Sequence, residues 1–333
     1  MNGEREYPGG GGRSDADRAD PLTAYRPSAG SGQALPLTAR EAQTFSGQSL
    51  LIRYINFVKL PHTLFALPFA LLGVLAASRL DQVTPRDVFL VVLAFSAARW
   101  AAMGFNRIAD RAFDARNPRT LNRELPRGSL SLTQAWVSVA VAASLFVLAA
   151  ALLNPLCLLL SPVALAWILL YSVSKRFTWW PHLWLGVSLA IAPVGGYLAV
   201  TGHWSDPPWM LLAITLAVAT WVAGFDIFYA LPDVGFDRAE GLRSAVVRLG
   251  ESRAILLAKL LHGITIPALA AFGYAAGFGL WYYLGLIVAA AILVYEHQLV
   301  RPGDLSRLDA AFFTMNGVMS VTVFGFALID RVL

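Results

Sequence analysis

The stretch Val88–Met103, VFLVVLAFSAARWAAM, decides the fold class of this chain. It is almost entirely apolar and, with its flanking residues, is long enough to cross the roughly 30 Å of hydrocarbon in a bilayer as an α-helix. It continues directly into Gly104–Thr120, GFNRIADRAFDARNPRT, which carries an Asn and two Asp four residues apart, followed by arginines. The sequence therefore predicts a membrane helix that ends in a polar, charged site.

The composition extends this interpretation to the whole chain. Of the 333 residues, 57% are hydrophobic and only 14% are charged, whereas a soluble domain averages about 25% charged residues. The formal net charge of +5 comes from arginines in the connections between apolar runs. We interpret it as a topology signal and expect no nucleic-acid partner. The single cysteine, Cys157, excludes a disulfide or a cysteine-based zinc site within one chain.

Nine apolar segments, each near the length of a membrane helix, follow one another along the chain. They span residues 62–80, 86–110, 132–153, 155–173, 181–201, 208–231, 252–273, 278–298 and 308–330. The predicted fold is an all-α polytopic membrane protein with nine transmembrane helices in residues 48–333. Residues 1–47 are rich in Gly, Ser, Pro, Asp and Arg, which predicts a disordered N-terminal tail and no cleaved signal peptide.

Basic residues are concentrated in alternate connections. The connections after the second, fourth, sixth and eighth segments hold most of the arginines and lysines, and the others hold few. By the positive-inside rule, these connections and the N-terminus lie in the cytoplasm. We therefore expect a multi-pass protein of the bacterial inner (plasma) membrane, with the polar ends of its second and sixth segments facing the cytoplasm.

The first acidic set consists of Asn106, Asp110 and Asp114, at positions i, i+4 and i+8. On a helix these side chains lie along one stripe, a turn apart. Three oxygen-bearing side chains repel one another unless a cation lies among them. Arg99 is on the same stripe but deeper, where a charge costs about 2.5–3.5 kcal/mol against lipid. We expect Arg99 to face a polar cavity, bound either to a structural partner or to a ligand.

The second acidic set lies in GFDIFYALPDVGFDRAEGLRS, Gly224–Ser244, and consists of Asp226, Asp233 and Asp237. Pro232 is predicted to break the helix, so that Asp233 and Asp237 open a short new helix with proline in its first turn. Asp226 is then the deeper member. Because both acidic sets lie at cytoplasmic helix ends, they can face each other across one cavity.

The combination of carboxylates and arginines indicates the kind of ligand. Carboxylates favour a hard divalent cation, and Mg²⁺ binds through one or two carboxylates, retained waters and substrate phosphates. Arginines make bidentate contacts to phosphate oxygens. At a membrane interface this chemistry predicts a lipid diphosphate, with its tail in the bilayer and its head in the polar cavity.

Two alternatives compete with this hypothesis. A structural membrane scaffold leaves both acidic sets unexplained. An ion-coupled membrane transporter predicts polar groups near the bilayer midplane at broken helices, whereas these acids cluster at one interface. The histidines show no metal-ligand spacing, and we expect packing or interfacial roles for them: His62, His182, His203, His262 and His297.

These motifs resemble those of UbiA-type aromatic prenyltransferases, the intramembrane enzymes of quinone biosynthesis. The matching elements are Asn106-x-x-x-Asp110-x-x-x-Asp114, Arg119-Thr120-x-x-Arg123, Tyr171-x-x-x-Lys175, Asp226-x-x-Tyr229-Ala230-x-x-Asp233-x-x-x-Asp237 and the opening stretch FVKLPHTLFALPFALLG with Lys59. The resemblance covers about residue 48 to the end. One departure is Arg107, which stands where some members carry a second acid directly after the Asn.

The resemblance implies a nine-helix bundle with a central cavity and Mg²⁺-dependent transfer of a polyprenyl group from polyprenyl diphosphate to an aromatic ring. The implied metal ligands are Asn106, Asp110, Asp114, Asp233 and Asp237. The implied substrate-binding residues are Lys59, Arg119, Arg123 and Lys175, with Arg243 a further candidate, while Tyr171 and Tyr229 orient substrate or line the path of the prenyl cation. The base that removes the ring proton is either Asp226 or the diphosphate.

The acceptor is less narrowly defined. The first motif most resembles the 4-hydroxybenzoate polyprenyltransferase branch, of ubiquinone biosynthesis, and some members of that branch serve menaquinone biosynthesis through a hydroxynaphthoate. Either acid carries a carboxylate that needs a cation, and Arg99 is the predicted partner. Haem O synthase and chlorophyll synthase share the fold, so haem or chlorophyllide is an alternative acceptor.

Overall fold

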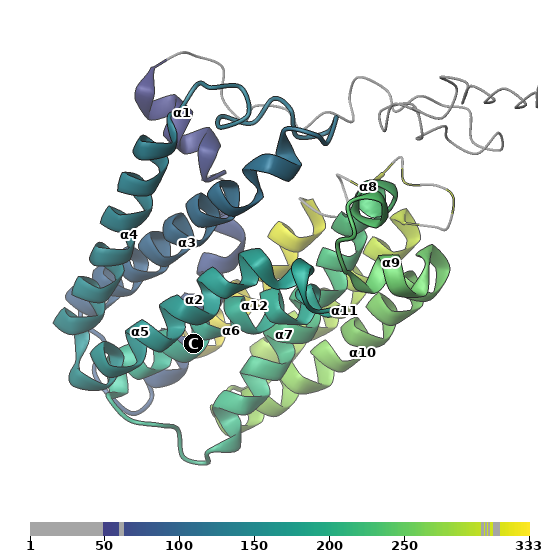
Figure 1. Cartoon of the computed structure of the whole chain (residues 1–333). Helices are drawn as coiled ribbons and strands as arrows, with labels where there is room; N and C mark the ends of the chain where they lie inside the picture. The colour runs from purple at the N-terminus through teal and green to yellow at the C-terminus, as the bar shows by residue number, and fades with distance from the viewer. Residues whose placement is uncertain (1–48, 60–62, 301–302, 304, 306, 309–313) are drawn as a thin grey trace, which may run out of the picture. The chain divides into compact units, whose positions relative to one another are not determined.

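The apolar segments form helices in the computed structural model of the chain (Figure 1). The structure describes residues 49–59, 63–300, 303, 305, 307, 308 and 314–333, so the predicted tail, residues 1–47, lies outside the described residues. The elements in order are α1 (Leu50–Phe57), α2 (Thr63–Ala77), α3 (Pro85–Asp114), α4 (Leu132–Leu153), α5 (Pro155–Leu170), η4 (Tyr171–Arg176), α6 (Pro181–Thr201), α7 (Trp209–Ala230), η5 (Leu231–Asp233), α8 (Val234–Ala239), α9 (Ala245–Leu249), α10 (Glu251–Ala275), α11 (Leu280–Leu299) and α12 (Asn316–Val332). No strand occurs in these residues.

Each predicted membrane segment corresponds to one helix, namely α2–α7 and α10–α12. Within the described part of the chain, seven helical segments are long and apolar enough to cross a membrane. Helices α2 and α12 are shorter, with 15 and 17 residues, and part of the last predicted segment, 308–330, lies outside the described residues. The polytopic helical class is therefore confirmed, whereas the described residues give seven long spans rather than nine.

Short polar caps determine where the helices begin. Thr84 and Asp87 form a capping box that starts α3, and Ser131 and Gln134 form one that starts α4. Asn154 caps α5 through the backbone nitrogen of Cys157, and its Nδ2 also donates to the carbonyl oxygen of Leu198, 2.8 Å away on α6. Such caps satisfy backbone N–H groups that the first helical turn leaves without partners.

Helix α7 lies at the centre of the bundle. It packs against α6 and α10, while α6 also contacts α2, and α3 packs against α4 (Figure 1). Of the apolar window in the segment that contains α7, 72% is buried, compared with 22% for α4. Trp221 of α7 is fully enclosed in the largest hydrophobic cluster. The α7 helix is therefore the core of the fold, and α4 is peripheral.

Helices α2 and α6 approach each other backbone to backbone. A Cβ atom on Gly73 would clash with the backbone oxygen of Pro193, and one on Gly196 would clash with the backbone oxygen of Ala70. Small residues at such contacts let membrane helices approach closely. This α2–α6 seam is consequently formed by main chain rather than by interdigitated side chains.

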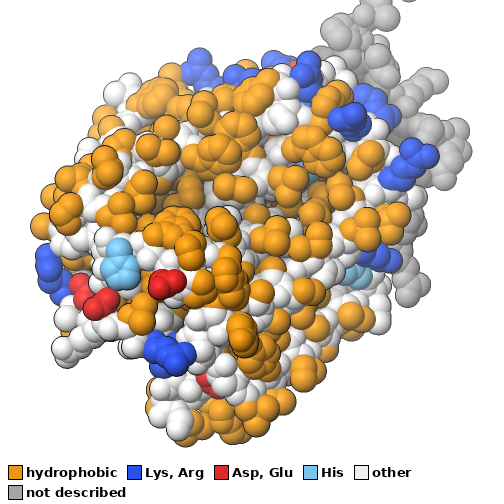
Figure 2. Space-filling model, turned by 90° about the horizontal axis from the view of Figure 1, so that it is seen from below, with side chains coloured by type: hydrophobic (Ala, Val, Ile, Leu, Met, Phe, Trp, Pro, Cys, Tyr) orange, Lys and Arg blue, Asp and Glu red, His pale blue; other side chains and the backbone are white. Residues whose placement is uncertain are grey.

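The surface of the bundle is apolar. Hydrophobic side chains cover most of the face shown in Figure 2. Large apolar residues are strongly exposed on the outer helices, for example Leu159 at 71%, Val163 at 67% and Ile287 at 66%. Soluble monomers rarely expose so much contiguous apolar surface. Together with the long apolar helices, this surface defines a multi-pass membrane protein.

The predicted break at Pro232 is present as a change of helix type. Helix α7 tightens into the 3₁₀ turn η5, with Pro232 in its first turn, and the short helix α8 follows directly. Asp233 ends η5 and Asp237 lies in the first turn of α8. The predicted short helix is therefore present as α8, but the proline lies in the preceding 3₁₀ turn and not in the first turn of this helix.

Candidate active site

The two acidic sets lie at the same end of the bundle and are joined by the segment that follows α3 (Figure 1). Nδ2 of Asn117 donates to Oδ1 of Asp233 at 3.2 Å. Nε of Arg119 donates to the same oxygen at 2.9 Å, and its Nη2 binds Oδ2. The connection after the first set thus holds Asp233 of the second set.

Arg119 also binds Tyr229, one turn before Asp233. Its Nη1 donates to the phenolic oxygen at 3.3 Å, and the guanidinium carbon lies 5.0 Å from the centre of the ring. Burial alone lowers the pKa of Arg119, but the interactions with Tyr229 and Asp233 outweigh it and hold the pKa above its ordinary value. The site therefore contains a fixed positive charge on a planar donor group.

Four carboxylates of the two sets are paired with Arg or Lys. The pairs are Asp110–Arg176 at 3.6 Å, Asp114–Arg123 at 2.6 Å, Asp237–Lys175 at 3.0 Å, and Asp233–Arg119. The charge of Lys175 also acts on Asp110, Asp233 and Asp226. Lys175 therefore interacts with both acidic sets. Within the first acidic set, Nδ2 of Asn106 donates to Oδ2 of Asp110 at 3.1 Å.

The donor set fits a hard cation that arrives with a phosphate ligand. Among the described residues, no group of three His, Cys, Asp or Glu is arranged to hold a metal ion by itself. However, Oδ2 of Asp114 is buried without a hydrogen-bond partner in this part of the chain. Mg²⁺ needs only one or two carboxylates when substrate phosphates complete its shell. The predicted ligands are therefore suited to Mg²⁺ bound together with a diphosphate.

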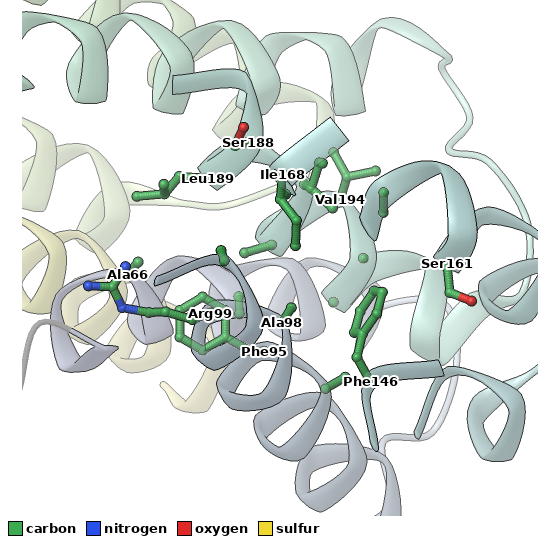
Figure 3. Close-up of a pocket in the computed structure, with 18 of the residues that line it drawn as sticks. Ala66, Phe95, Ala98, Arg99, Phe146, Ser161, Ile168, Ser188, Leu189 and Val194 are labelled. Carbon is green, nitrogen blue, oxygen red and sulfur yellow. The ribbon is translucent and has the colours of Figure 1, made fainter. Parts of the chain in front are cut away.

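An apolar cavity of about 220 Å³ lies below the acidic sets, between helices α2, α3, α4, α5 and α6 (Figure 3). Asn106, Arg99 and Tyr171 line it together with many apolar side chains, among them Phe95 and Phe146. In Figure 3 the guanidinium of Arg99 and the ring of Phe146 lie at opposite sides of the cavity. The cavity therefore has a few polar groups and a long apolar wall.

Arg99 faces this cavity as predicted, but the cavity is mainly apolar instead of polar. The prediction assumed that a charge within a membrane helix needs polar walls, whereas here the lining is mostly Ala, Leu, Val and Phe. The Nε–H of Arg99 is buried and donates to no acceptor among the described residues. The expected structural partner for this atom is thus missing from the described part of the chain, which favours the ligand-binding alternative.

Arg243, the further candidate for contact with the diphosphate, lies beside the η4 turn. Its Nη1 donates to the carbonyl oxygen of Phe177 at 2.8 Å, and its backbone nitrogen donates to the carbonyl oxygen of Lys175 at 2.7 Å. Its guanidinium lies 5.7 Å from the ring centre of Trp179. Arg243 therefore holds the η4 turn, which presents Lys175 and Tyr171, and does not itself reach the paired carboxylates.

Two further basic residues lie beside α1. Lys59 is buried in the turn after this helix, with φ of 48°, a backbone conformation that is uncommon outside glycine. Nε of Arg107 donates to the carbonyl oxygen of Phe57 at 3.3 Å. The residue that replaces the second acid of some family members thus anchors α1 to α3.

Sequence reasoning missed three side chains at this site. Asn117 and Arg176 are immediate neighbours of matched motifs in NPRT and in Lys175-Arg176, which is a usable signal. His182 gave no such signal. It is buried, which agrees with the expected packing role, but its Nδ1 also lies 2.6 Å from Oδ2 of Asp226, a residue that the packing of α6 on α7 brings near.

The fold and the site define a multi-pass membrane enzyme with a charged pocket above an apolar cavity. Residues 66–318 match the UbiA prenyltransferase family. The 4-hydroxybenzoate octaprenyltransferase of Nitrosococcus oceani is 31% identical over 280 residues, 84% of this chain and 97% of that protein. The corresponding enzyme of Pseudomonas aeruginosa is 32% identical over 227 residues, 68% of this chain and 75% of that protein.

Solved structures agree with this relationship. The apo structure of a UbiA homolog from Aeropyrum pernix K1 has a TM-score of 0.74 and 33% identity, covering 82% of this chain and 98% of that one. A UbiA homolog from Archaeoglobus fulgidus bound to DMAPP and Mg²⁺ shares the fold, with a TM-score of 0.67 and 20% identity over 84% of this chain and 99% of that one. The chain belongs to the UbiA prenyltransferase family, and it is a prenyltransferase.

Proposed function

We propose that this enzyme transfers a polyprenyl group from polyprenyl diphosphate to an aromatic hydroxy acid, 4-hydroxybenzoate or dihydroxynaphthoate, in ubiquinone or menaquinone biosynthesis. The observation that carries the proposal is the contact of Asn117 and Arg119 with Asp233, which joins both acidic sets into one site beside an apolar cavity. A lipid diphosphate needs a charged site for its head group and an apolar cavity for its tail. The relatives named 4-hydroxybenzoate octaprenyltransferase support the choice of acceptor.

The cofactor that we propose is Mg²⁺, which the archaeal homolog with DMAPP also contains. Asn106, Asp110, Asp114, Asp233 and Asp237 would hold it, and it would stabilise the negative charge that develops on the leaving diphosphate. Once these carboxylates turn to the cation, their present partners become available to phosphate oxygens. Those partners are Arg119, Arg123 and Lys175.

The remaining residues orient the organic groups. The prenyl tail lies in the cavity below the acids, and the allylic C1 lies near the rings of Tyr171 and Tyr229, whose π faces stabilise positive charge. Arg99 binds the carboxylate of the acceptor, because its guanidinium lines the cavity. The ring carbon ortho to the phenol then attacks C1, and loss of a proton restores aromaticity. Lys59 is a further proposed contact for the diphosphate.

The proposed location is the bacterial inner membrane, with the active site on its cytoplasmic side. The support is the crowding of arginines and lysines at the end of the bundle that carries both acidic sets. Polyprenyl diphosphate reaches the cavity from within the bilayer, while the water-soluble acceptor and Mg²⁺ reach the charged end from the cytoplasm.

The experiment that tests the function uses purified enzyme, polyprenyl diphosphate, Mg²⁺ and a mixture of 4-hydroxybenzoate, dihydroxynaphthoate, haem and chlorophyllide. Mass spectrometry of the products identifies the acceptor and the chain that is transferred. We expect a prenylated aromatic acid, and a turnover lowered by about 10²-fold or more in Asp110→Asn and Asp237→Asn. Arg116→Gln is the matched control, because Arg116 forms an exposed pair with Glu240.

Two results contradict the proposal. Full turnover in both Asn variants means that these carboxylates do not serve the reaction. Metal-dependent flux of ions across proteoliposomes, without prenyl transfer to any acceptor, favours the transporter alternative instead.

A further inference from the structure

Asp226 differs from the other carboxylates of the two sets. Its Oδ2 lies 2.6 Å from Nδ1 of His182, whereas the other four pair with Arg or Lys. A permanent cation stabilises the charged form of a carboxylate and makes it a poor proton acceptor. A neutral imidazole only donates one hydrogen bond. Among the described residues, Asp226 is therefore the carboxylate of the two sets whose side-chain partner is an imidazole and not an ammonium or a guanidinium.

Asp226 also lies deeper in the bundle than the other acids of its set, as a residue that contacts the aromatic acceptor must. It precedes Asp233 by seven residues on α7 and η5, which places it about 10 Å further into the bundle. Asp226 interacts electrostatically with both Lys175 and Tyr171. Tyr171 lines the cavity. Asp226 therefore interacts both with the ammonium that pairs with Asp237 and with a residue that lines the cavity.

His182 cannot reach a substrate by itself. It lies in the first turn of α6, directly after Pro181, and is only 1% exposed. Its Nδ1–H donates to the carboxylate of Asp226. The other ring nitrogen, Nε2, is buried without a hydrogen-bond partner among the described residues. A proton on Nε2 would be a buried, unsatisfied donor. The ring can therefore act only through Asp226.

We propose that His182 is a positioning residue that holds Asp226 ready to accept the ring proton, an inference that rests on the proposed function. The new C–C bond forms as the C1–O bond breaks, and the electron pair of that bond leaves with the diphosphate. The proton on the attacked ring carbon then passes to Oδ1 of Asp226, and the C–H electrons restore the aromatic ring. The hydrogen bond from His182 to Oδ2 keeps Oδ1 directed at this proton.

Kinetics with an acceptor that carries either protium or deuterium at the attacked position test the proposal. His182→Leu removes the hydrogen bond, and His182→Asn retains an N–H donor close to the position of Nδ1. We expect His182→Leu to lower kcat about 10- to 100-fold at unchanged KM for the diphosphate, with turnover that becomes slower for the deuterated acceptor. His182→Asn should restore most of kcat and abolish the isotope dependence.

The matched control is His203→Leu, on the exposed turn after α6, which should leave kcat and the isotope dependence unchanged. If His182→Leu does not fold, Asp226→Asn must show the same isotope-dependent loss. Isotope-insensitive turnover in His182→Leu, or in Asp226→Asn where that variant replaces it, overturns the inference while leaving the proposed function intact. Wild-type enzyme that prenylates no aromatic acid overturns the proposed function and this inference with it.

Discussion

Nζ of Lys175 lies 3.0 Å from Oδ2 of Asp237, and its charge also acts on Asp110, so one ammonium group joins the two acidic sets. In the absence of substrate, this group balances carboxylates that the proposed function assigns to Mg²⁺. Diphosphate and metal would therefore bind together, because Lys175 would leave its carboxylate for a phosphate oxygen when that carboxylate is needed to hold the metal. The ion pairs of the free protein are, in this view, the resting form of the binding site.

Replacing Lys175 separates metal affinity from turnover. In Lys175→Met, Asp237 loses its competing cation, so Mg²⁺ should bind the substrate-free protein more tightly than it binds wild type. Turnover should nevertheless fall by about 10²-fold, because a donor to the leaving diphosphate is lost. Titration calorimetry and steady-state kinetics measure the two effects. Lys259→Gln, an exposed position on α10, is the control, and weaker metal binding in Lys175→Met would contradict the exchange of partners.

Lysine should not be able to replace the bidentate guanidinium group of Arg119. Arg119→Lys keeps the charge but loses the bidentate contact with Asp233 and the contact with Tyr229. We expect kcat/KM for the diphosphate to fall by about 10²-fold in a kinetic assay. The control is Arg116→Lys, which changes an arginine of the same connection whose pair with Glu240 is exposed. Equal activity of Arg119→Lys and wild type would exclude a role for the bidentate guanidinium group.

Filling the cavity should select against long prenyl chains. Ala94 lines the cavity twelve residues before Asn106 on the same helix, about 18 Å from it. Ala94→Phe should lower kcat/KM for a long polyprenyl diphosphate by about 10- to 100-fold, and should leave the reaction with DMAPP unchanged. Leu145→Phe adds a ring on the exposed face of α4 as the control. Equal losses for both substrates would place the tail elsewhere.

A buried polar chain that contains no member of the two acidic sets should matter for stability and not for catalysis. Nε1 of Trp221 donates to Oδ1 of Asn316 at 2.8 Å, and Nδ2 of Asn316 donates to Glu296 at 3.3 Å. Asn316→Leu leaves the indole N–H without an acceptor, which costs about 1–3 kcal/mol. Thermal unfolding in detergent should show a lower Tm, with Val318→Leu, an exposed change on α12, unaffected. An unchanged Tm in Asn316→Leu would show that the chain is dispensable.

The parts of the fold that follow from local sequence were predictable. Apolar length locates helices α3 to α7, and polar caps begin α3, α4 and α5. The spacing of Asn106, Asp110 and Asp114 fixes their common stripe. The close contact between Asn106 and Asp110 is a direct result of that spacing. The meeting of the two acidic sets was also foreseeable, because charge placed both at the same membrane face.

The partners of the acids were not predictable. Arg243 resembles a phosphate ligand in sequence, but the packing of the connection after α8 turns it to Phe177. His182 lies at the start of an apolar helix, and its bond to Asp226 exists only because α6 and α7 pack together. Such pairings depend on helix rotation and depth, which periodicity does not specify. The apolar lining around Arg99 was equally unpredictable, because it is formed by side chains from several helices.

The α2–α6 seam gives the cavity two walls of unequal stiffness. On the seam side, main chain touches main chain, so Gly73 and Gly196 leave no side chain that could rearrange. On the opposite side, α4 and α5 have most of their surface towards lipid, with only 22% of each apolar window buried. We therefore expect a bulkier lipid substrate to be accommodated by outward displacement of α4 and α5, and not of α2 and α6. The bilayer, and not the protein core, absorbs the added volume.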